Sequence, residues 1–330
     1  MELKDKRILY ISPKFFNYEN KIKEELESLG AIVDFFDDRP ANDFITKVFI
    51  RLNFKSLIQK KIDTYYESIY FYISDKKYDF IFVISPETLS YKELTKIKEL
   101  QFNTEFILYM WDSFENKNSL NTINLYDKVY SFDSRDTEKY SLKFLPLFYC
   151  KDYKKSEQIN NFDYDLSFIA TAHSDRYKIA DKIKKIIYKN QFKEYYYFYL
   201  PNIIIYFIRK IFISKYLYGK LSEFSFDSLT QSNIIEIFNN SKVILDINHP
   251  KQFGLTMRTF ECLGAEKKII TTNQNIKSYD FYNPKNILVI DRENINIDMD
   301  FFEVEYQILS DELYKKYSLN SWIKNIFIKK

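Results

Sequence analysis

Short apolar runs alternate with segments of helical period along this chain, and this alternation most constrains its fold. In the first half, the helical segments lie at residues 21–29, 44–73 and 91–100. The apolar runs lie at residues 7–12, 31–36, 78–84, 105–110, 128–132 and 144–147. Runs that are apolar throughout are typical of parallel strands covered by helices on both faces. The first half therefore predicts a doubly wound α/β domain.

The same alternation restarts after a polar stretch at residues 150–163, which lacks periodicity and suits a linker. Strands are predicted at 165–170, 194–199, 242–247, 268–271 and 286–290, and helices at 176–188, 234–239, 255–263 and 319–328. We therefore predict two Rossmann-like doubly wound parallel-sheet domains, at residues 1–150 and 164–330. Packing of the final helix back on the first domain is left open.

Composition excludes several classes of protein. The 49 basic and 46 acidic residues give a net charge of +3, which provides no general attraction to nucleic acid. The two cysteines, Cys150 and Cys262, form no CxxC pair and predict neither a disulfide framework nor a zinc site. The charged residues before the first strand resemble no signal peptide, and no uncharged apolar run reaches the ~18 residues of a membrane span. We expect a cytoplasmic protein.

Both histidines of the chain follow predicted strands. His173 comes after the strand ending at Ala170, and His249 comes after the strand ending at Ile247. Open parallel sheets bind ligands beyond the carboxyl ends of their strands. We therefore predict a functional cleft at this edge of the second domain. The alternative is two histidines in surface loops.

The segment 249–261 runs from a strand end through a glycine-containing loop into a helix. Gly254 lets the backbone approach a ligand, and the helix start offers N–H groups that suit a diphosphate. Thr256 can cap the helix or donate its hydroxyl, and Arg258 can contact phosphate. Glu261, on the same face, can accept hydrogen bonds from two ribose hydroxyls. The alternative is an Arg–Glu pair on the surface.

The loop after the strand at 165–170 has the same layout. Either Ser174 or Asp175 is expected to cap the following helix. Arg176 at the helix start opposes the helix dipole, which indicates an anionic ligand.

In the first half, Asp112 also follows a predicted strand, where it can act as a general base or cap the next turn. The acidic pair Asp37 and Asp38 resembles a metal site, but the following Arg39 and Pro40 favour a turn. The chain contains no HExxH, GxSxG or Walker-type motif. We predict no metal and no cofactor.

The basic, apolar stretch at residues 203–213 has two interpretations. It can lie on a membrane surface, or it can form a buried hairpin or helix of the second domain.

The residues LDINHPKQFGLTMRTFE at 245–261, KIITTN at 268–273, YDFY at 279–282 and NI at 286–287 resemble bacterial GT-B glycosyltransferases. The closest group is the CgeB-like and lipopolysaccharide or capsular polysaccharide biosynthesis transferases. The likeness is specific over about residues 241–291. It implies two Rossmann-like domains facing each other across a cleft, with the nucleotide sugar in the second domain and the acceptor in the first.

This resemblance places Arg258 and Glu261 at the phosphate and ribose of the nucleotide sugar. The predicted catalytic residues are Asp112 and His249. The predicted residues that bind the nucleotide sugar are His173, Arg176, Gln252, Gly254, Thr256, Arg258, Thr259, Glu261 and Asn273. Many retaining members carry a second glutamate eight residues before the one aligned with Glu261, but Phe253 occupies that position here. Retention or inversion therefore stays open.

The predicted function is transfer of a sugar from a nucleotide-sugar donor to a lipopolysaccharide, capsule or related cell-surface glycan or glycolipid. Whether the protein also contacts the inner face of the plasma membrane peripherally is left open. The alternatives are a nucleotide-sugar epimerase on the same scaffold and a non-catalytic binding protein with a degenerate transferase fold.

Overall fold

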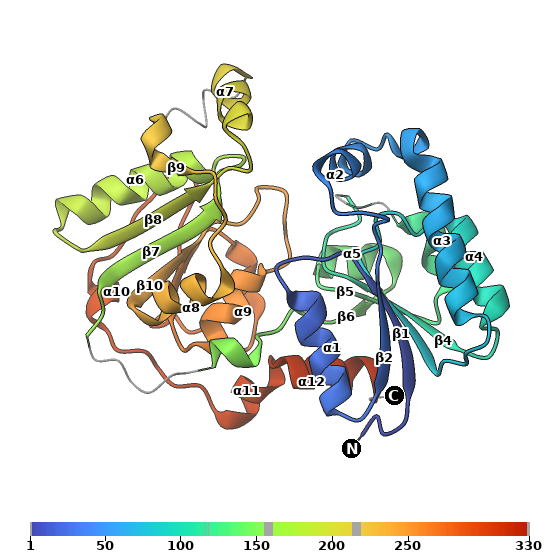
Figure 1. Cartoon of the computed structure of the whole chain (residues 1–330). Coiled ribbons are helices and arrows are strands. Elements are labelled where there is room, and N and C mark those ends of the chain that lie inside the picture. The colour runs from blue at the N-terminus through green and yellow to red at the C-terminus, as the bar shows by residue number, and fades with distance from the viewer. Residues whose placement is uncertain (1, 116, 118, 155–160, 213–218, 329–330) are drawn as a thin grey trace. The chain divides into compact units, whose positions relative to one another are not determined.

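The computed structural model describes residues 2–115, 117, 119–154, 161–212 and 219–328. The chain divides into two units. Unit 1 comprises Met1–Pro146 and Ile323–Lys330, and unit 2 comprises Leu147–Trp322. Each unit contains one six-stranded sheet, and every pair of neighbouring strands is parallel (Figure 1). This architecture confirms the predicted α/β class of Rossmann-like sheets.

The sheet of unit 1 has the strand order β2-β1-β3-β4-β5-β6. Its strands are β1 (Arg7–Ser12), β2 (Ile32–Asp37), β3 (Phe80–Ile84), β4 (Glu105–Met110), β5 (Lys128–Ser131) and β6 (Lys143–Phe144). Its helices within the first 146 residues are α1 (Tyr18–Ser28), α2 (Phe44–Arg51), η1 (Lys55–Ile58), α3 (Gln59–Ile73), α4 (Tyr91–Leu100), η2 (Leu120–Leu125) and α5 (Ser134–Tyr140). Side chains of β1, β3 and β4 form a core with α3 and α4.

The helix predicted over residues 44–73 is interrupted. The first part, α2, ends at Arg51, and Asn53 has a left-handed backbone with φ 60°. The helix resumes as α3, where Tyr66, Ile69 and Ile73 recur on one face and are fully buried. The periodicity of the apolar residues was correct, but no proline or glycine marks the break in the sequence.

The sheet of unit 2 has the order β12-β11-β10-β7-β8-β9. Its strands are β7 (Tyr164–Thr171), β8 (Glu194–Tyr199), β9 (Phe224–Ser225), β10 (Ser241–Asp246), β11 (Lys268–Thr271) and β12 (Ile287–Val289). Its helices are η3 (Lys151–Tyr153), α6 (Arg176–Lys189), α7 (Ile203–Phe212), η4 (Leu221–Glu223), α8 (Gln231–Asn239), α9 (Met257–Gly264), η5 (Gln274–Ser278), α10 (Asp300–Glu303) and α11 (Asp311–Lys316). From β7, the chain builds β8 and β9 on one side and then β10 to β12 on the other. The side of the sheet on which successive strands are added therefore changes between β7 and β10, although all strands stay parallel.

The last helix, α12 (Leu319–Phe327), contains residues of both units. Its Trp322 packs against Phe148 in unit 2, with ring centroids 4.7 Å apart. Its Phe327 packs against Phe80 and Phe82 of β3 in unit 1, with centroids 5.2 Å apart in each pair. Unit 1 therefore takes part of its core from residues that follow unit 2 in the sequence.

Candidate functional site

The candidate site lies at the carboxyl edge of the unit 2 sheet, where β7 and β10 are parallel neighbours. The segments that leave these two strands bring His173 and His249 together, with ring centroids 5.7 Å apart. A reversal of strand order is the place where open α/β sheets bind ligands, because the two connecting segments diverge there. The strand-end rule applied to the sequence thus selected two residues that are neighbours in space.

Both imidazoles lie in surroundings that disfavour their protonated forms. Burial, followed by the charges of Arg176 and Arg209, lowers the pKa of His173 to about 3. Burial also lowers the pKa of His249, and Arg176 and Arg292 add to the effect. Both rings are therefore neutral at pH 7, and each can donate one hydrogen bond and accept another.

Helix α6 begins at this edge, directly after the loop that leaves β7. The predicted cap residue Asp175 occupies the N-cap position, but its side chain accepts no hydrogen bond from the helix. Instead, its carboxylate oxygens accept from Nη1 of Arg292 at 2.9 and 2.8 Å. Ser174 has φ 49°, and its hydroxyl donates to the carbonyl of His173 at 2.7 Å. The first turn of α6 is left without a side-chain cap or an acidic residue.

Arg176 occupies the first position of α6, and its Nε donates to the carbonyl of Ile247 at 2.6 Å. This bond ties the end of β10 to the start of the helix that follows β7. Burial, together with the charges of Arg258 and Arg292 and against the opposing charge of Asp246, lowers the pKa of Arg176 to about 10. The guanidinium therefore stays protonated at pH 7 while other cations surround it.

Two arginines at this edge were missed by the sequence analysis. Nη2 of Arg292 donates to the backbone carbonyl and side-chain oxygen of Asn248, at 2.5 and 2.6 Å. Nη1 of Arg209, on α7, donates to the carbonyl of Ala172 at 2.5 Å. Arg292 follows β12 closely, so the strand-end rule would have selected it. Nothing in the sequence near Arg209 indicated its position.

These residues form the arginine cluster, which we define as Arg176, Arg209, Arg258 and Arg292. Among the described carboxylates, Glu261 pairs with Arg258 and Asp175 pairs with Arg292. The charge of Asp246 also acts on Arg176. Four cations thus face three anions beside the positive end of α6. Such an arrangement has an excess positive potential that favours an anionic ligand.

The loop-to-helix junction before α9 is anchored on Asp246, the last residue of β10. Its Oδ2 accepts from the hydroxyl of Thr256 at 2.7 Å and from that of Thr259 at 3.0 Å. Thr256 also caps α9, because its hydroxyl oxygen accepts from the backbone N–H of Thr259 at 3.4 Å. Both roles proposed for Thr256 from the sequence are present, and both serve the junction itself. Binding of a nucleotide sugar by these threonines stays a prediction.

The loop at residues 252–254 is held by amide side chains. Nε2 of Gln252 donates to the carbonyl of Gly254 at 3.0 Å. Nδ2 of Asn273, which follows β11, donates to the carbonyls of Phe253 and Gly254 at 3.1 and 3.2 Å. Gly254 and Asn273 are buried. Gln252 and Asn273 therefore shape the loop, and their predicted contact with the nucleotide sugar would add to this role.

Arg258 and Glu261 form an ion pair with 3.3 Å between Nη1 and Oε2. The pair is internal, since Glu261 is only 5% exposed and the guanidinium lies over the ring of Phe238, 4.7 Å from its centroid. Burial and then the charge of Glu261 raise the pKa of Tyr153, and the two side chains share a hydrogen bond. The alternative from the sequence, an Arg–Glu pair, is therefore present, but it is buried and does not lie on the surface. The phosphate and ribose contacts stay predictions.

Asp112 lies at the carboxyl edge of the other sheet, after β4 in unit 1. Its Oδ2 lies 3.2 Å from Nζ of Lys117, and its side chain is 41% exposed. Lys117 also contacts Oε1 of Glu87 at 2.9 Å, and Glu87 receives two hydrogen bonds from Arg39 at 2.5 and 2.9 Å. Burial alone would raise the pKa of Glu87, but Arg39 and Lys117 outweigh burial and hold it at about 2.

The acidic pair lies where β2 ends, since Asp37 is the last residue of the strand and the chain bends at Asp38. The buried carboxylate of Asp38 accepts from the backbone N–H groups of Glu87, Thr88 and Leu89, at 2.5, 2.8 and 2.9 Å. Oδ1 of Asp37 accepts from the backbone N–H of Arg39 at 2.9 Å. In the part of the chain that the structure describes, no three His, Cys, Asp or Glu side chains are grouped to hold a metal ion.

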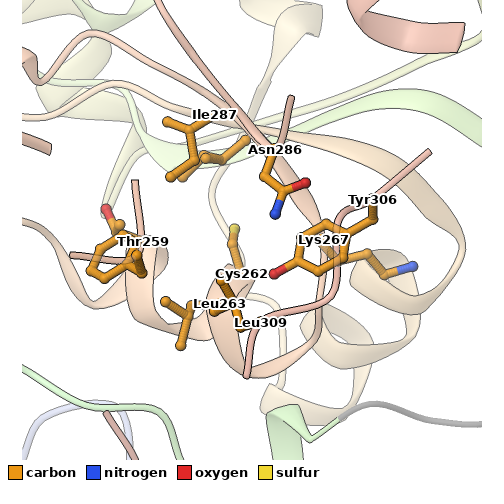
Figure 2. Close-up of a pocket in the computed structure, with 10 residues that line it drawn as sticks. Thr259, Cys262, Leu263, Lys267, Asn286, Ile287, Tyr306 and Leu309 are labelled. Carbon is orange, nitrogen blue, oxygen red and sulfur yellow. The ribbon is translucent and has the colours of Figure 1, made fainter. Parts of the chain in front are cut away.

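A small cavity of about 20 Å³ lies between α9 and the amino ends of β11 and β12 (Figure 2). Cys262, Lys267, Asn286 and Tyr306 are among its lining residues. Nζ of Lys267 donates to the carbonyl of Asn239 at 2.8 Å. Thr259 of the junction before α9 also lines this cavity, so the cavity reaches from the amino ends of β11 and β12 to the base of that junction.

Comparison with solved structures identifies similar folds over the whole chain. HepE of Anabaena, crystallised with UDP and glucose, has a TM-score of 0.58 at 12% identity, covering 97% of this chain and 98% of that one. A glycosyltransferase from Rickettsia africae has a TM-score of 0.50 at 15% identity, covering 98% and 94%. UDP-GlcNAc 2-epimerase of Methanocaldococcus jannaschii has a TM-score of 0.50 at 12% identity, covering 98% and 93%.

At these identities the likeness is one of fold, and it agrees with the GT-B fold that the sequence resemblance implied. No family model matches the chain, and no curated protein matches its sequence. Among the described helices, none has the length and apolar character needed to cross a bilayer.

Proposed function

We propose that this protein is a glycosyltransferase that takes a sugar from a nucleotide-sugar donor. The observation that carries the proposal is the arginine cluster beside the uncapped N-terminus of α6, at the strand-order reversal between β7 and β10. A nucleotide diphosphate has the charge and acceptor oxygens that such a site recognises. HepE, which shares the fold, was crystallised with UDP and glucose and also with UDP-glucose.

The proposed mechanism is electrostatic. As the bond between the sugar carbon and the diphosphate oxygen breaks, negative charge grows on that oxygen. The positive end of the α6 dipole and the charges of Arg176 and Arg292 would stabilise this charge, with Arg258 and the start of α9 as a second contact. Neutral His249 would donate a hydrogen bond to the leaving phosphate. No step requires a metal ion.

The acceptor hydroxyl must lose its proton as it attacks the sugar, and we assign this step to Asp112. The test is Asp112→Asn, which should lower kcat for transfer and leave donor affinity unchanged. Unchanged kcat would exclude Asp112 as the base.

Further parts of the proposal concern the acceptor and the compartment. Based on the sequence resemblance, we propose a lipopolysaccharide, capsule or related cell-surface glycan as the acceptor, and the cytoplasm as the compartment. Assays with glycan fractions from the native organism test the acceptor.

The proposal is tested by a thermal-shift screen against nucleotide sugars, because a ligand that binds only the folded state raises its melting temperature. We expect at least one UDP-sugar to raise the melting temperature, and Arg176→Gln to remove most of the shift. No shift with any nucleotide sugar would contradict the proposal.

The ribose contact of Glu261 has its own test. Glu261→Gln keeps the size of the side chain but weakens its acceptance of two hydroxyls. Tyr153→Phe is the matched control, because it removes one of the protein partners of Glu261, leaves the ion pair with Arg258, and removes no predicted ligand contact. A loss of UDP affinity in Glu261→Gln alone supports the ribose role, whereas equal affinities assign Glu261 to packing.

A nucleotide-sugar epimerase is a second candidate, because the fold is shared with UDP-GlcNAc 2-epimerase at a TM-score of 0.50. Incubation of the nucleotide sugar without acceptor discriminates between the two. An epimerase changes the configuration of the sugar while it stays on the nucleotide, and a transferase does not.

A further inference from the structure

Helix α7 directs its apolar face away from the protein. The inward residues are Ile205, Tyr206 and Arg209, and Tyr206 is only 2% exposed. The exposed apolar side chains are Ile203, Ile204, Phe207, Ile208 and Ile211, at 43%, 61%, 52%, 50% and 73% of their areas. A surface helix of a globular protein normally has the opposite arrangement, with its apolar stripe toward the core. We call this row of five side chains the α7 ridge.

The ridge is held firmly in its outward orientation. The ring of Tyr206 packs against Phe224 with centroids 5.4 Å apart, and its hydroxyl donates to the carbonyl of Gly219 at 3.0 Å. Arg209 donates to the carbonyl of Ala172, beside His173 of the candidate site. The helix stands beside β9 (Figure 1). Both anchors use inward side chains, so the ridge cannot turn inward without breaking them.

The surroundings of the ridge are basic. No acidic residue occurs between Glu194 and Glu223 in the sequence. Within the described residues, the exposed Lys210 and Lys220 form no ion pair with a carboxylate. On α4, by contrast, the exposed Lys92 pairs with Asp63 at 3.1 Å. Ile213, the last residue of the basic, apolar stretch at 203–213, lies outside the described residues.

We propose that the α7 ridge docks on the surface of an anionic lipid bilayer. An apolar helix face inserts at the boundary between headgroups and acyl chains, and neighbouring cations attract anionic headgroups. The unpaired positive charge is what favours a lipid surface over a second copy of this chain, because two such ridges would repel each other. The helix would lie on the bilayer and not cross it.

Docking has a consequence for the acceptor, which rests on the proposed function. Because Arg209 ties α7 to the segment carrying His173, the carboxyl edge of the unit 2 sheet would be held near the bilayer. The sugar would then be transferred to a lipid-linked glycan and not to a soluble one.

The test is co-sedimentation with vesicles of phosphatidylcholine alone or mixed with phosphatidylglycerol. We expect binding to the mixed vesicles at low salt, and loss of binding as salt is raised. Phe207→Glu with Ile208→Glu should lower the bound fraction about tenfold or more, since both apolar insertion and charge are lost. The control is Phe71→Glu with Tyr188→Glu, because these side chains are 85% and 78% exposed on other helices.

Three outcomes would overturn the proposal: no binding to mixed vesicles at low salt, equal binding by the ridge and control variants, or self-association without vesicles that only the ridge variant loses. The last outcome would assign the ridge to a dimer interface. Thermal shift by UDP-sugars is measured on the same samples without vesicles. A retained shift with lost vesicle binding separates failure of docking from failure of the proposed function.

Discussion

The two sheets place polar residues at the same kind of edge but differ in how their charges are compensated. In unit 1, Arg39 and Lys117 are paired with Glu87 and Asp112 at distances of 2.5 to 3.2 Å. In unit 2, Arg176 and Arg209 donate to backbone carbonyls, and the first turn of α6 has no acidic residue. The first edge therefore satisfies its own charges, whereas the second keeps an excess of positive charge.

This difference shows that position at a strand end does not by itself identify an anion site. Both edges meet the positional rule, and the balance of cations, anions and helix ends separates them. Substitutions at the two edges should therefore have different effects. Charge removal at the unit 2 edge should affect ligand binding, and at the unit 1 edge it should affect folding.

The largest effect is expected at Arg176. Arg176→Gln should reduce kcat/KM for a UDP-sugar about 10²–10³-fold, because it removes a preorganised cation from the leaving group. Steady-state kinetics and the UDP thermal shift measure this loss. Lys117→Gln in unit 1 is the matched control for binding, and an equal loss of thermal shift in both variants would remove the distinction between the two edges.

The next effect is on the stability of unit 1. Glu87→Ala leaves Arg39 and Lys117 without their shared carboxylate, and the Glu87 side chain is only 10% exposed. We expect a loss of about 3 kcal/mol in the free energy of unfolding. Hydrogen exchange of the β3 amides in urea reports on unit 1 separately.

Glu99→Ala is the control for this measurement, since Glu99 pairs with Lys96 at a side-chain exposure of 61%. It should cost less than about 0.5 kcal/mol. Equal costs at positions 87 and 99 would mean that the unit 1 edge contributes no more than a surface pair.

A smaller effect is expected from pH. The pKa of His173 is about 3 in the folded protein and would return toward 6.5 on unfolding. Between pH 6.5 and pH 3 the unfolded state therefore binds more protons than the folded state. The contribution of His173 to the free energy of unfolding is complete above pH 6.5 and falls as the pH drops toward 3. Allowing for partial exposure, we expect unit 2 to lose about 1 kcal/mol between pH 7 and pH 5.

Unit 1 contains neither of the two histidines and should change little over this range. Denaturation midpoints at several pH values, followed by probes in each unit, test the difference. His173→Gln should flatten the pH dependence of unit 2. An unchanged slope in this variant would contradict the assignment.

The smallest effect on folding is expected at Asp112. Asp112→Asn should change the free energy of unfolding by less than about 0.5 kcal/mol, because the pair with Lys117 is 41% exposed on the aspartate side. Urea denaturation measures this value. A cost near that of Glu87→Ala would show that Asp112 belongs to the buried network of unit 1.

The sequence predicted most strands because their apolar runs are local. The bounds of β1, β4, β8 and β11 match the predictions residue for residue. The break after Arg51 and the short strand β9 were missed, since neither carries a distinctive pattern. For the site, adjacency of His173 and His249 followed from topology alone.

What the sequence could not predict depends on contacts between distant segments. The burial of Glu261 requires Tyr153, more than a hundred residues earlier. Asp175 accepts hydrogen bonds from Arg292 and does not cap α6 with its side chain. This arrangement depends on the path of the chain after β12. In both cases a local role was expected and a distant partner replaced it.

The division of α12 between the two units bears on how this protein is made. Phe327 contributes to the core of unit 1, yet the ribosome adds it only after all of unit 2 has been synthesised. Unit 1 therefore cannot complete its core until unit 2 has left the exit tunnel, and Phe80 and Phe82 stay incompletely covered until then. Translation speed and chaperone access during that interval would influence the yield of folded protein.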